Sequence, residues 1–153
     1  MPQVTSNREF PVPRKEAFEY VTDPKTWPTF YSNLIEITDP ESTAFGKPGD
    51  TVSFVYSILG RRVNATATLQ EIVYGEVVRH TVKIEGLPDV HQEWEYSDTD
   101  DGFAVRVTMN TDESTSLFGK TIDRFVVPKA LQRDLERTLE NMEAMFALGI
   151  PGE

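Results

Sequence analysis

The sequence has 153 residues, which suits one domain large enough to bury a single core or to enclose one pocket. It carries 25 Asp and Glu against 15 Lys and Arg, a formal net charge of −10 that opposes binding to phosphate backbones and anionic lipid surfaces. Cysteine is absent, which excludes disulfides, thiolate metal sites and cysteine nucleophiles. No apolar run approaches the ~18 residues of a membrane span, so the sequence predicts a soluble, cytoplasmic protein that binds no nucleic acid and does not insert stably into a membrane.

Two short helical segments follow a first strand that ends near Phe10. The segment 13–21, PRKEAFEYV, has a proline at an N-terminal position and apolar residues at core-facing spacing. Pro24 cannot continue that helix, so we expect a second short turn that Asp23 caps and Trp27 anchors. The sequence thus predicts two short helices instead of one long one.

Apolar residues alternate with a period of two after Asn33, which predicts a run of antiparallel hairpins. The strands are expected at residues 34–39, 51–59, 61–73, 76–85, 90–98 and 103–113. From Phe118 the period becomes helical and predicts that the longest helix ends the chain near Gly149. Its apolar stripe is formed by Leu131, Leu135, Leu139, Met142 and Phe146.

The hairpins can be checked against one another, because residues that lie opposite in an antiparallel pair face the same side of the sheet. With two-residue turns such as Gly60 and Arg61, one apolar face carries through four successive turns. The expected pairs are Ile58 with Val63, Leu69 with His80, His80 with Trp94, and Trp94 with Val105.

One face of the predicted sheet is apolar and the other is polar. The apolar face should point toward the C-terminal helix, the only element large enough to cover it. This inward set is Val52, Phe54, Tyr56, Ala65, Ala67, His80, Val82, Gln92, Trp94, Val105 and Val107. On the outer face, Thr66, Thr81, Glu93 and Arg106 should point to solvent.

Two small residues, Ala65 and Ala67, lie in the middle of the inward face, where a tightly packed core favours larger side chains. The sheet and the helix are therefore not expected to fill the space between them. We expect a mostly apolar cavity within the ~300 to 1,000 Å³ range that is typical of small-molecule sites.

Three segments of the sequence resemble the polyketide cyclase/dehydrase-type proteins of the START-like, Bet v 1-like (SRPBCC) superfamily. These segments are residues 10–34, the hairpin TDDGFAVRVT at 99–108, and residues 117–146. The resemblance covers essentially the whole chain and implies one α+β domain over residues 1–150. The implied architecture is a helix-grip fold, in which a curved antiparallel sheet wraps around the C-terminal helix and encloses a hydrophobic ligand cavity. The two short helices would then support one end of the sheet.

The resemblance leaves the function open. Members of the superfamily include aromatase/cyclases, lipid or sterol carriers, hormone receptors and quinone-binding proteins. Aromatase/cyclase members use an arginine inside the cavity to orient a poly-ketone chain. Here Arg61, Arg79 and Arg106 are expected in a turn or on the outer face, so no arginine can be carried across from those members, which argues against cyclase activity.

His80 is the sharpest single candidate for chemistry. The expected register turns it inward beside Trp94, where its imidazole could act as an acid or base, or donate a hydrogen bond to a ligand carbonyl. The structural alternative is a core histidine whose hydrogen bonds are satisfied. Glu71 shares its facing and is a weak partner, because a bulge near the strand end would turn it away.

Sparse polar side chains in an apolar wall are typical of pockets that orient neutral ligands. The expected inward face holds Tyr56, Gln92, Trp94, Tyr96 and Thr111, although the aromatic rings suit core filling equally well. The predicted ligand-binding residues are Phe54, Tyr56, Ala65, Ala67, His80, Val82, Gln92, Trp94, Tyr96, Val105 and Val107.

No metal site or cofactor is predicted. His91 has the opposite parity to His80 and should face water, which argues against a metal-binding pair. Asp98, Asp100 and Asp101 suit a turn with Gly102 better than a cation site.

Three functions remain open on this basis. The first is sequestration or transfer of a small hydrophobic molecule such as a lipid, sterol, quinone or polyketide-like aromatic. The second is an enzyme that catalyses cyclisation, dehydration or isomerisation of such a molecule with His80 as acid or base. The third is an interaction protein, which the polar outer face of the sheet argues against.

Overall fold

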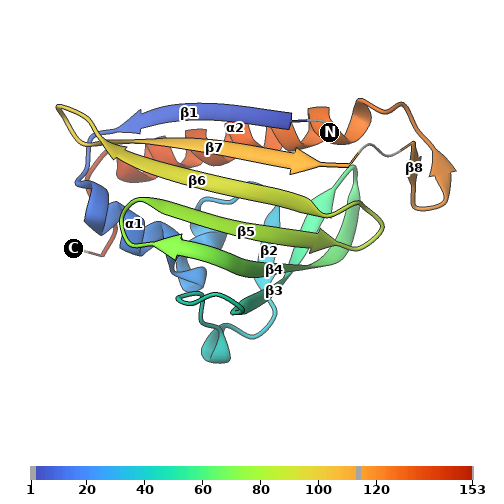
Figure 1. The fold of residues 1–153 in the computed structure, drawn as a ribbon, viewed down its shortest axis with the longest axis horizontal. Coiled ribbons are helices and arrows are strands. Elements are labelled where there is room, and N and C mark those ends of the chain that lie inside the picture. Colours follow the sequence, from blue (N-terminus) through green and yellow to red (C-terminus); the bar gives the residue numbers. More distant parts are fainter. Residues whose placement is uncertain (1–2, 113–114, 153) are drawn as a thin grey trace.

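The computed structural model describes residues 3–112 and 115–152, apart from the side chain of Ser42. These residues form a seven-stranded antiparallel sheet in the order β1-β7-β6-β5-β4-β3-β2, together with the long helix α2 (Figure 1). In Figure 1 the helix runs behind β1 and β7, the first and the last strand of this sheet along the chain, which pair with each other. The arrangement confirms the predicted α+β helix-grip fold.

The order of the elements follows the sequence prediction closely. The strands are β1 (Gln3–Phe10), β2 (Leu34–Ile37), β3 (Thr51–Ile58), β4 (Arg61–Val73), β5 (Val77–Ile84), β6 (Val90–Asp98) and β7 (Phe103–Thr111). The helical elements are α1 (Arg14–Thr22), the 3-10 segments η1 (Pro24–Thr29) and η2 (Pro40–Ser42), and α2 (Val126–Phe146).

A small hairpin, β8 (Ser116–Leu117) and β9 (Lys120–Thr121), stands where the sequence predicted the return to helical periodicity. Phe118 and Gly119 adopt positive φ angles of 51° and 79°, so the chain reverses there and cannot form a helix. The prediction of helical structure from residue 118 is therefore wrong, and the helix begins eight residues later.

The two short helical elements after β1 form as predicted. The Oδ1 atom of Asp23 accepts a hydrogen bond of 3.0 Å from the backbone N–H of Lys25, which caps η1. The indole N–H of Trp27 donates a 2.9 Å hydrogen bond to the carbonyl of Val21 and ties η1 to α1. Because both elements bury apolar side chains, they close one end of the sheet.

In three of the four predicted hairpins, the pairing of the strands differs from the structure by two residues. Leu59 and Gly60, with φ angles of 49° and 81°, form the first turn, so Ile58 pairs with Arg61 and not with Val63. The pairing of Leu69 with His80 is confirmed. The remaining observed pairs are His80 with Gln92 and Trp94 with Val107. A slip of two residues changes no facing, because side chains alternate with a period of two.

The facing prediction holds with one exception. The inward set is buried, apart from Tyr56 and Gln92, which are partly buried. On the outer face, Arg106 is exposed, but Thr81 is only 7 % exposed, which contradicts its predicted contact with solvent. Thr81 lies between Thr68 and His91 on the neighbouring strands, and its hydroxyl oxygen is 2.9 Å from Nδ1 of His91.

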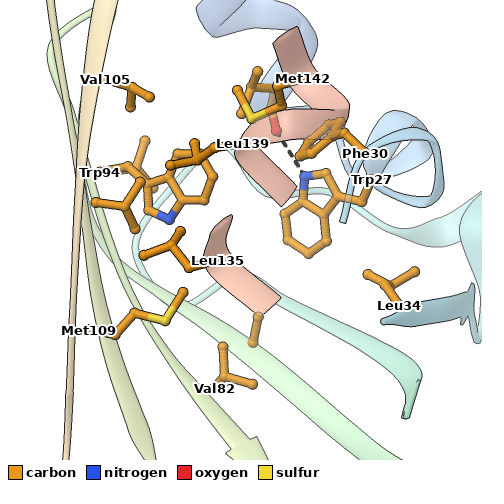
Figure 2. Packing of buried hydrophobic residues seen from close by; sticks show 14 of the residues in the cluster. Trp27, Phe30, Leu34, Val82, Trp94, Val105, Met109, Leu135, Leu139 and Met142 are labelled. Atoms are coloured by element: carbon orange, nitrogen blue, oxygen red, sulfur yellow. Dashed lines mark hydrogen bonds between the residues drawn. The ribbon is translucent and has the colours of Figure 1, made fainter. Parts of the chain in front are cut away.

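All five residues of the predicted stripe on α2 are buried. Figure 2 shows Leu135 and Leu139 on the side of the helix that faces Trp94 and Met109 of the sheet. The stripe thus provides the single covering layer that the apolar face of the sheet requires.

Gly102, in the β6–β7 turn, packs closely on the backbone that joins β1 to α1. A Cβ atom at this position would lie 2.1 Å from the carbonyl oxygen of Phe10 and 2.8 Å from the amide nitrogen of Val12. We expect Gly102→Ala to lower the free energy of unfolding by ~1 to 3 kcal/mol, measured by urea denaturation. Gly46→Ala is the matched control, because no described atom lies within 4 Å of its Cβ position and its change should stay within ~0.5 kcal/mol. Equal stability of the two variants would contradict the packing.

Candidate ligand-binding site

An internal cavity lies between the inward face of the sheet and the N-terminal half of α2. Its volume is about 60 Å³, enough for a few water molecules and well below the predicted range. The lining residues are Trp27, Tyr31, Ser32, Asn33, Leu34, Phe54, Tyr56, Ala67, His80, Val82, Ile84, Val90, Gln92, Trp94, Met109, Leu131, Asp134, Leu135 and Thr138.

Aromatic rings explain why the cavity is smaller than the sequence predicted. The ring centroid of Tyr31 lies 5.9 Å from that of Trp94 and 5.5 Å from that of Trp27. These side chains occupy much of the space beside the small Ala67. The prediction considered only the sheet and the helix, whereas η1 and the segment after it also enter this space.

Seven of the eleven predicted ligand-binding residues line the cavity. They are Phe54, Tyr56, Ala67, His80, Val82, Gln92 and Trp94. Ala65, Tyr96, Val105 and Val107 are buried but do not line it. Tyr96 lies further along the sheet, where its ring stacks on Phe103 at 5.9 Å.

Helix α2 contributes four lining residues that share one helical face: Leu131, Asp134, Leu135 and Thr138. Their spacing of i, i+3, i+4 and i+7 is the signal that could have identified Asp134 and Thr138 from the sequence. An acidic residue at an apolar position of a helix is unusual, and the sequence analysis missed it.

Asp134 forms the centre of a polar cluster at one edge of the cavity. The hydroxyl of Tyr56 and the side-chain amide of Asn33 each donate a hydrogen bond to its carboxylate. Burial raises the pKa of Asp134 above its usual value, and these two hydrogen bonds oppose the shift. The cluster joins β3 and the segment before β2 to α2. Next to it, the backbone N–H of Ser32 donates to the hydroxyl of Thr138 at 3.1 Å.

His80 lies on β5 and is only 5 % exposed. The ring of Phe45, from the loop before β3, packs edge-on against the imidazole at a centroid distance of 5.7 Å. Burial lowers the pKa of His80 from 6.5 to about 4, and a hydrogen bond with Gln92 opposes part of this shift. The imidazole is therefore neutral at physiological pH.

The Nδ1 atom of His80 is buried and has no hydrogen-bond partner among the residues that the structure describes. An unpaired polar atom in the interior costs free energy, so most such atoms in native proteins have a partner. The Nδ1 atom of His80 thus lacks, among the described residues, the partner that a satisfied core histidine would have.

A second, smaller space of about 10 Å³ lies on the side of His80 that faces η1 and the Phe45 loop. Four side chains line both spaces: Trp27, Tyr31, His80 and Trp94. They form the partition between the two spaces, and a movement of any of them would change the volume available to a ligand.

The remaining candidates lie outside the cavity. The register shift between Leu69 and Glu71 turns Glu71 to the outer face, where it forms a 2.8 Å ion pair with Arg79. Glu71 is therefore not a partner of His80. Arg61 and Arg106 do not line the cavity either, and His91 is exposed as predicted. Thr111 donates a 3.1 Å hydrogen bond to the carbonyl of Asp89.

The burial of His80 generates a prediction about stability and pH. Between pH 6.5 and about 4 the unfolded chain binds a proton at His80 that the folded protein does not, so stability falls as the pH falls. This effect amounts to about 3 kcal/mol from pH 7 to pH 4. We expect His80→Gln to lose correspondingly less stability over that range in urea denaturation. Asp134 is present in both proteins, so its own titration cancels in the comparison.

His91→Gln is the control and should retain the pH dependence of the wild type, because it leaves His80 in place. If wild type and His80→Gln lose stability in parallel between pH 7 and pH 4, the proposed burial of a neutral imidazole is contradicted.

Solved structures of other proteins share this fold. Protein CV1439 from Chromobacterium violaceum matches with a TM-score of 0.70 and 13% identity, over 95% of this chain and 97% of that one. TTHA0849 from Thermus thermophilus matches with a TM-score of 0.71 and 17% identity, over 94% and 95% of the two chains. Ara h 8.0201 matches with a TM-score of 0.65 and 14% identity, over 93% and 95%. At these identities the likeness shows the fold alone.

No curated protein sequence matches this chain at a significant level. Within the described residues, no helix is long and apolar enough to cross a membrane. Residues 1–147, by contrast, match the sequence family described as "Polyketide cyclase / dehydrase and lipid transport". Since this match covers nearly the whole chain, the protein belongs to the polyketide cyclase/dehydrase and lipid transport family of the SRPBCC, Bet v 1-like proteins.

Proposed function

We propose that this protein binds a small, mostly apolar molecule in the cavity between the sheet and α2, and sequesters or transfers it. The observation that carries the proposal is an internal space walled by apolar side chains with few polar groups, among them His80 and Asp134. Proteins of this family typically bind hydrophobic ligands, which supports the same function.

The volume of the cavity limits the ligand. A space of about 60 Å³ is smaller than the ~150 Å³ of a cavity that binds benzene, so even a single-ring molecule requires some lining side chains to move. A lipid, sterol, quinone or polyketide-like aromatic would have to displace side chains of the partition, Trp27, Tyr31, His80 and Trp94. Trp27 and Trp94 are held by indole hydrogen bonds to Val21 and Gln92, whereas the hydroxyl of Tyr31 makes none with the described residues. Displacement of Tyr31 therefore breaks no side-chain hydrogen bond with the described residues, although it separates the ring from Trp27, Phe30 and Trp94.

Catalysis by proton transfer through His80 has weaker support. A histidine with a pKa of about 4 is a poor general acid or base near neutral pH. No carboxylate hydrogen-bonds to His80 within the part of the chain that the structure describes, and Glu71 lies on the outer face. The binding function requires only the cavity.

The domain organisation, the partners and the location of the protein are further parts of the proposed function. We propose that residues 1–150 act as one domain, because β1 and β7 pair along their full length and α2 packs against β1. The net charge of −10 disfavours nucleic acid as a partner. The absence of cysteine is consistent with a cytoplasmic location.

Two alanines on β4 give a matched test of the cavity. Ala67 lines it and Ala65 does not, although both are buried. We expect Ala67→Leu to occupy the space and abolish binding of toluene, followed by NMR titration. Ala65→Leu adds the same side chain at a buried position that does not border the cavity. It should therefore lower the free energy of unfolding by ~1 to 3 kcal/mol, more than Ala67→Leu does.

The outcome that would sink this proposal is the absence of toluene binding to the wild type, or a loss of stability in Ala67→Leu as large as in Ala65→Leu. If toluene does bind, native mass spectrometry of the protein purified from its own source can identify a natural ligand that is retained on purification.

A further inference from the structure

The wall of the cavity carries one negative charge and no positive one. Among the lining residues that the structure describes, Asp134 is the only acidic side chain, and neither lysine nor arginine is present. His80 also lines the cavity, but its imidazole is neutral at physiological pH. The electrostatic character of the site therefore depends on Asp134.

The carboxylate of Asp134 is held at the cavity by two neutral donors. The side-chain amide of Asn33 donates to Oδ1, and the hydroxyl of Tyr56 donates to Oδ2. A carboxylate has about four lone-pair sites, so roughly two are left for a further donor. Because all three side chains of this cluster border the cavity, a ligand in that space lies next to the carboxylate.

This polar edge is also where the cavity comes close to solvent. Asn33, Tyr56 and Asp134 are partly exposed, as is Ser32, whereas most of the other lining residues are buried. A polar group of a ligand can stay near water at this edge while the apolar part of the ligand lies deeper. The site therefore suits a molecule with one polar end.

A cation is the partner that the ionised carboxylate lacks. Two arginines next to it on α2, Arg133 and Arg137, are exposed, and neither forms an ion pair with Asp134 within the described part of the chain. Charge-assisted hydrogen bonds are stronger than neutral ones, and a partly buried charge costs least when it is paired. Aromatic side chains attract cations as well, and the lining includes Trp27, Tyr31, Phe54, Tyr56 and Trp94.

We propose that the ligand is an apolar molecule with a protonated amine, and that its ammonium group donates a hydrogen bond to Asp134 at the polar edge of the cavity. This inference rests on the proposed binding function and specifies its ligand class. An anionic ligand, such as a fatty acid, would meet the charge of Asp134 without any lining cation to compensate it. A neutral alcohol can donate to the same oxygens, but it leaves the charge of the carboxylate unpaired.

Four single-ring probes of similar shape test the inference: toluene, benzyl alcohol, benzylamine and benzoate. At pH 7 they carry no polar group, a neutral hydroxyl, an ammonium group and a carboxylate. The quantity to measure by NMR titration is the ratio of benzylamine affinity to benzyl alcohol affinity. We expect this ratio to fall about 10-fold in Asp134→Asn, near the low end for a hydrogen bond to a charged group because Asp134 is partly exposed.

Glu140→Gln is the matched control for charge. It removes one negative charge from an exposed position of α2 that does not line the cavity, so the ratio should stay as in the wild type. Toluene binding to Asp134→Asn shows that the variant keeps its cavity. Benzoate should bind the wild type more weakly than toluene does.

Nuclear Overhauser effects in the wild type give a second readout that needs no variant. We expect the methylene protons of bound benzylamine to lie near the side-chain amide protons of Asn33, and the ring protons near Leu135 and Trp94. The reverse orientation, with the ring at Asn33 and the methylene group at Trp94, would overturn the inference.

The results separate this inference from the binding function on which it rests. If toluene binds but Asp134→Asn leaves the benzylamine-to-benzyl alcohol ratio unchanged, the cavity binds apolar molecules without selecting an amine, and the inference is wrong. Benzoate that binds the wild type as tightly as benzylamine would contradict it in the same way. If none of the four probes binds to the wild type, the proposed function and the inference both fail.

Discussion

The structure depends on the burial of one stripe of α2 against the apolar face of one sheet. The C-terminal part of this stripe packs solidly, because Phe146 lies against the rings of Phe10 and Phe103 at centroid distances of 5.7 and 6.1 Å. Fully burying a large apolar side chain contributes about 1.5 to 3 kcal/mol, so this end holds the helix in place. The N-terminal part, from Leu131 to Thr138, borders the cavity instead. A single helix therefore stabilises the fold at one end and walls the candidate site at the other.

Two polar side chains interrupt the apolar wall, and they differ in whether other residues form hydrogen bonds with their polar atoms. Asp134 is partly buried at an energetic cost, but Tyr56 and Asn33 both donate to it, and the cluster links three segments of the chain beside the cavity. The Nδ1 atom of His80 receives no such compensation from the described residues. A buried polar atom that is left unpaired costs about 1 to 3 kcal/mol. The first feature is satisfied within the fold, whereas the second has no partner among the described residues.

Much of this architecture could be predicted from the sequence, because the period of the apolar pattern decides facing. Strand pairings that were wrong by two residues left His80, Gln92 and Trp94 on the correct side of the sheet. The buried Thr81 was not predictable from parity, since its burial depends on the size and position of His91 on the next strand. The volume of the cavity was overestimated because Trp27 and Tyr31 reach it from outside the sheet and helix.

Asp134 shows the limit of such predictions most clearly. Its helical spacing from Leu131 places it on the inward face, but its hydrogen bonds come from Tyr56 and Asn33, which only the fold brings near it. Patterns along the chain predict which face a residue occupies, whereas the partners of a buried polar atom are set by the three-dimensional packing.

The central claim is that the space between the sheet and α2 accepts an apolar molecule. A crystal structure of the protein soaked in bromobenzene tests it most directly, because the anomalous scattering of bromine locates the ligand without ambiguity. The account predicts a bromine peak inside the cavity, among Val82, Trp94 and Leu135. Bromine peaks confined to the surface of the protein, with the cavity empty or filled by side chains, would contradict it.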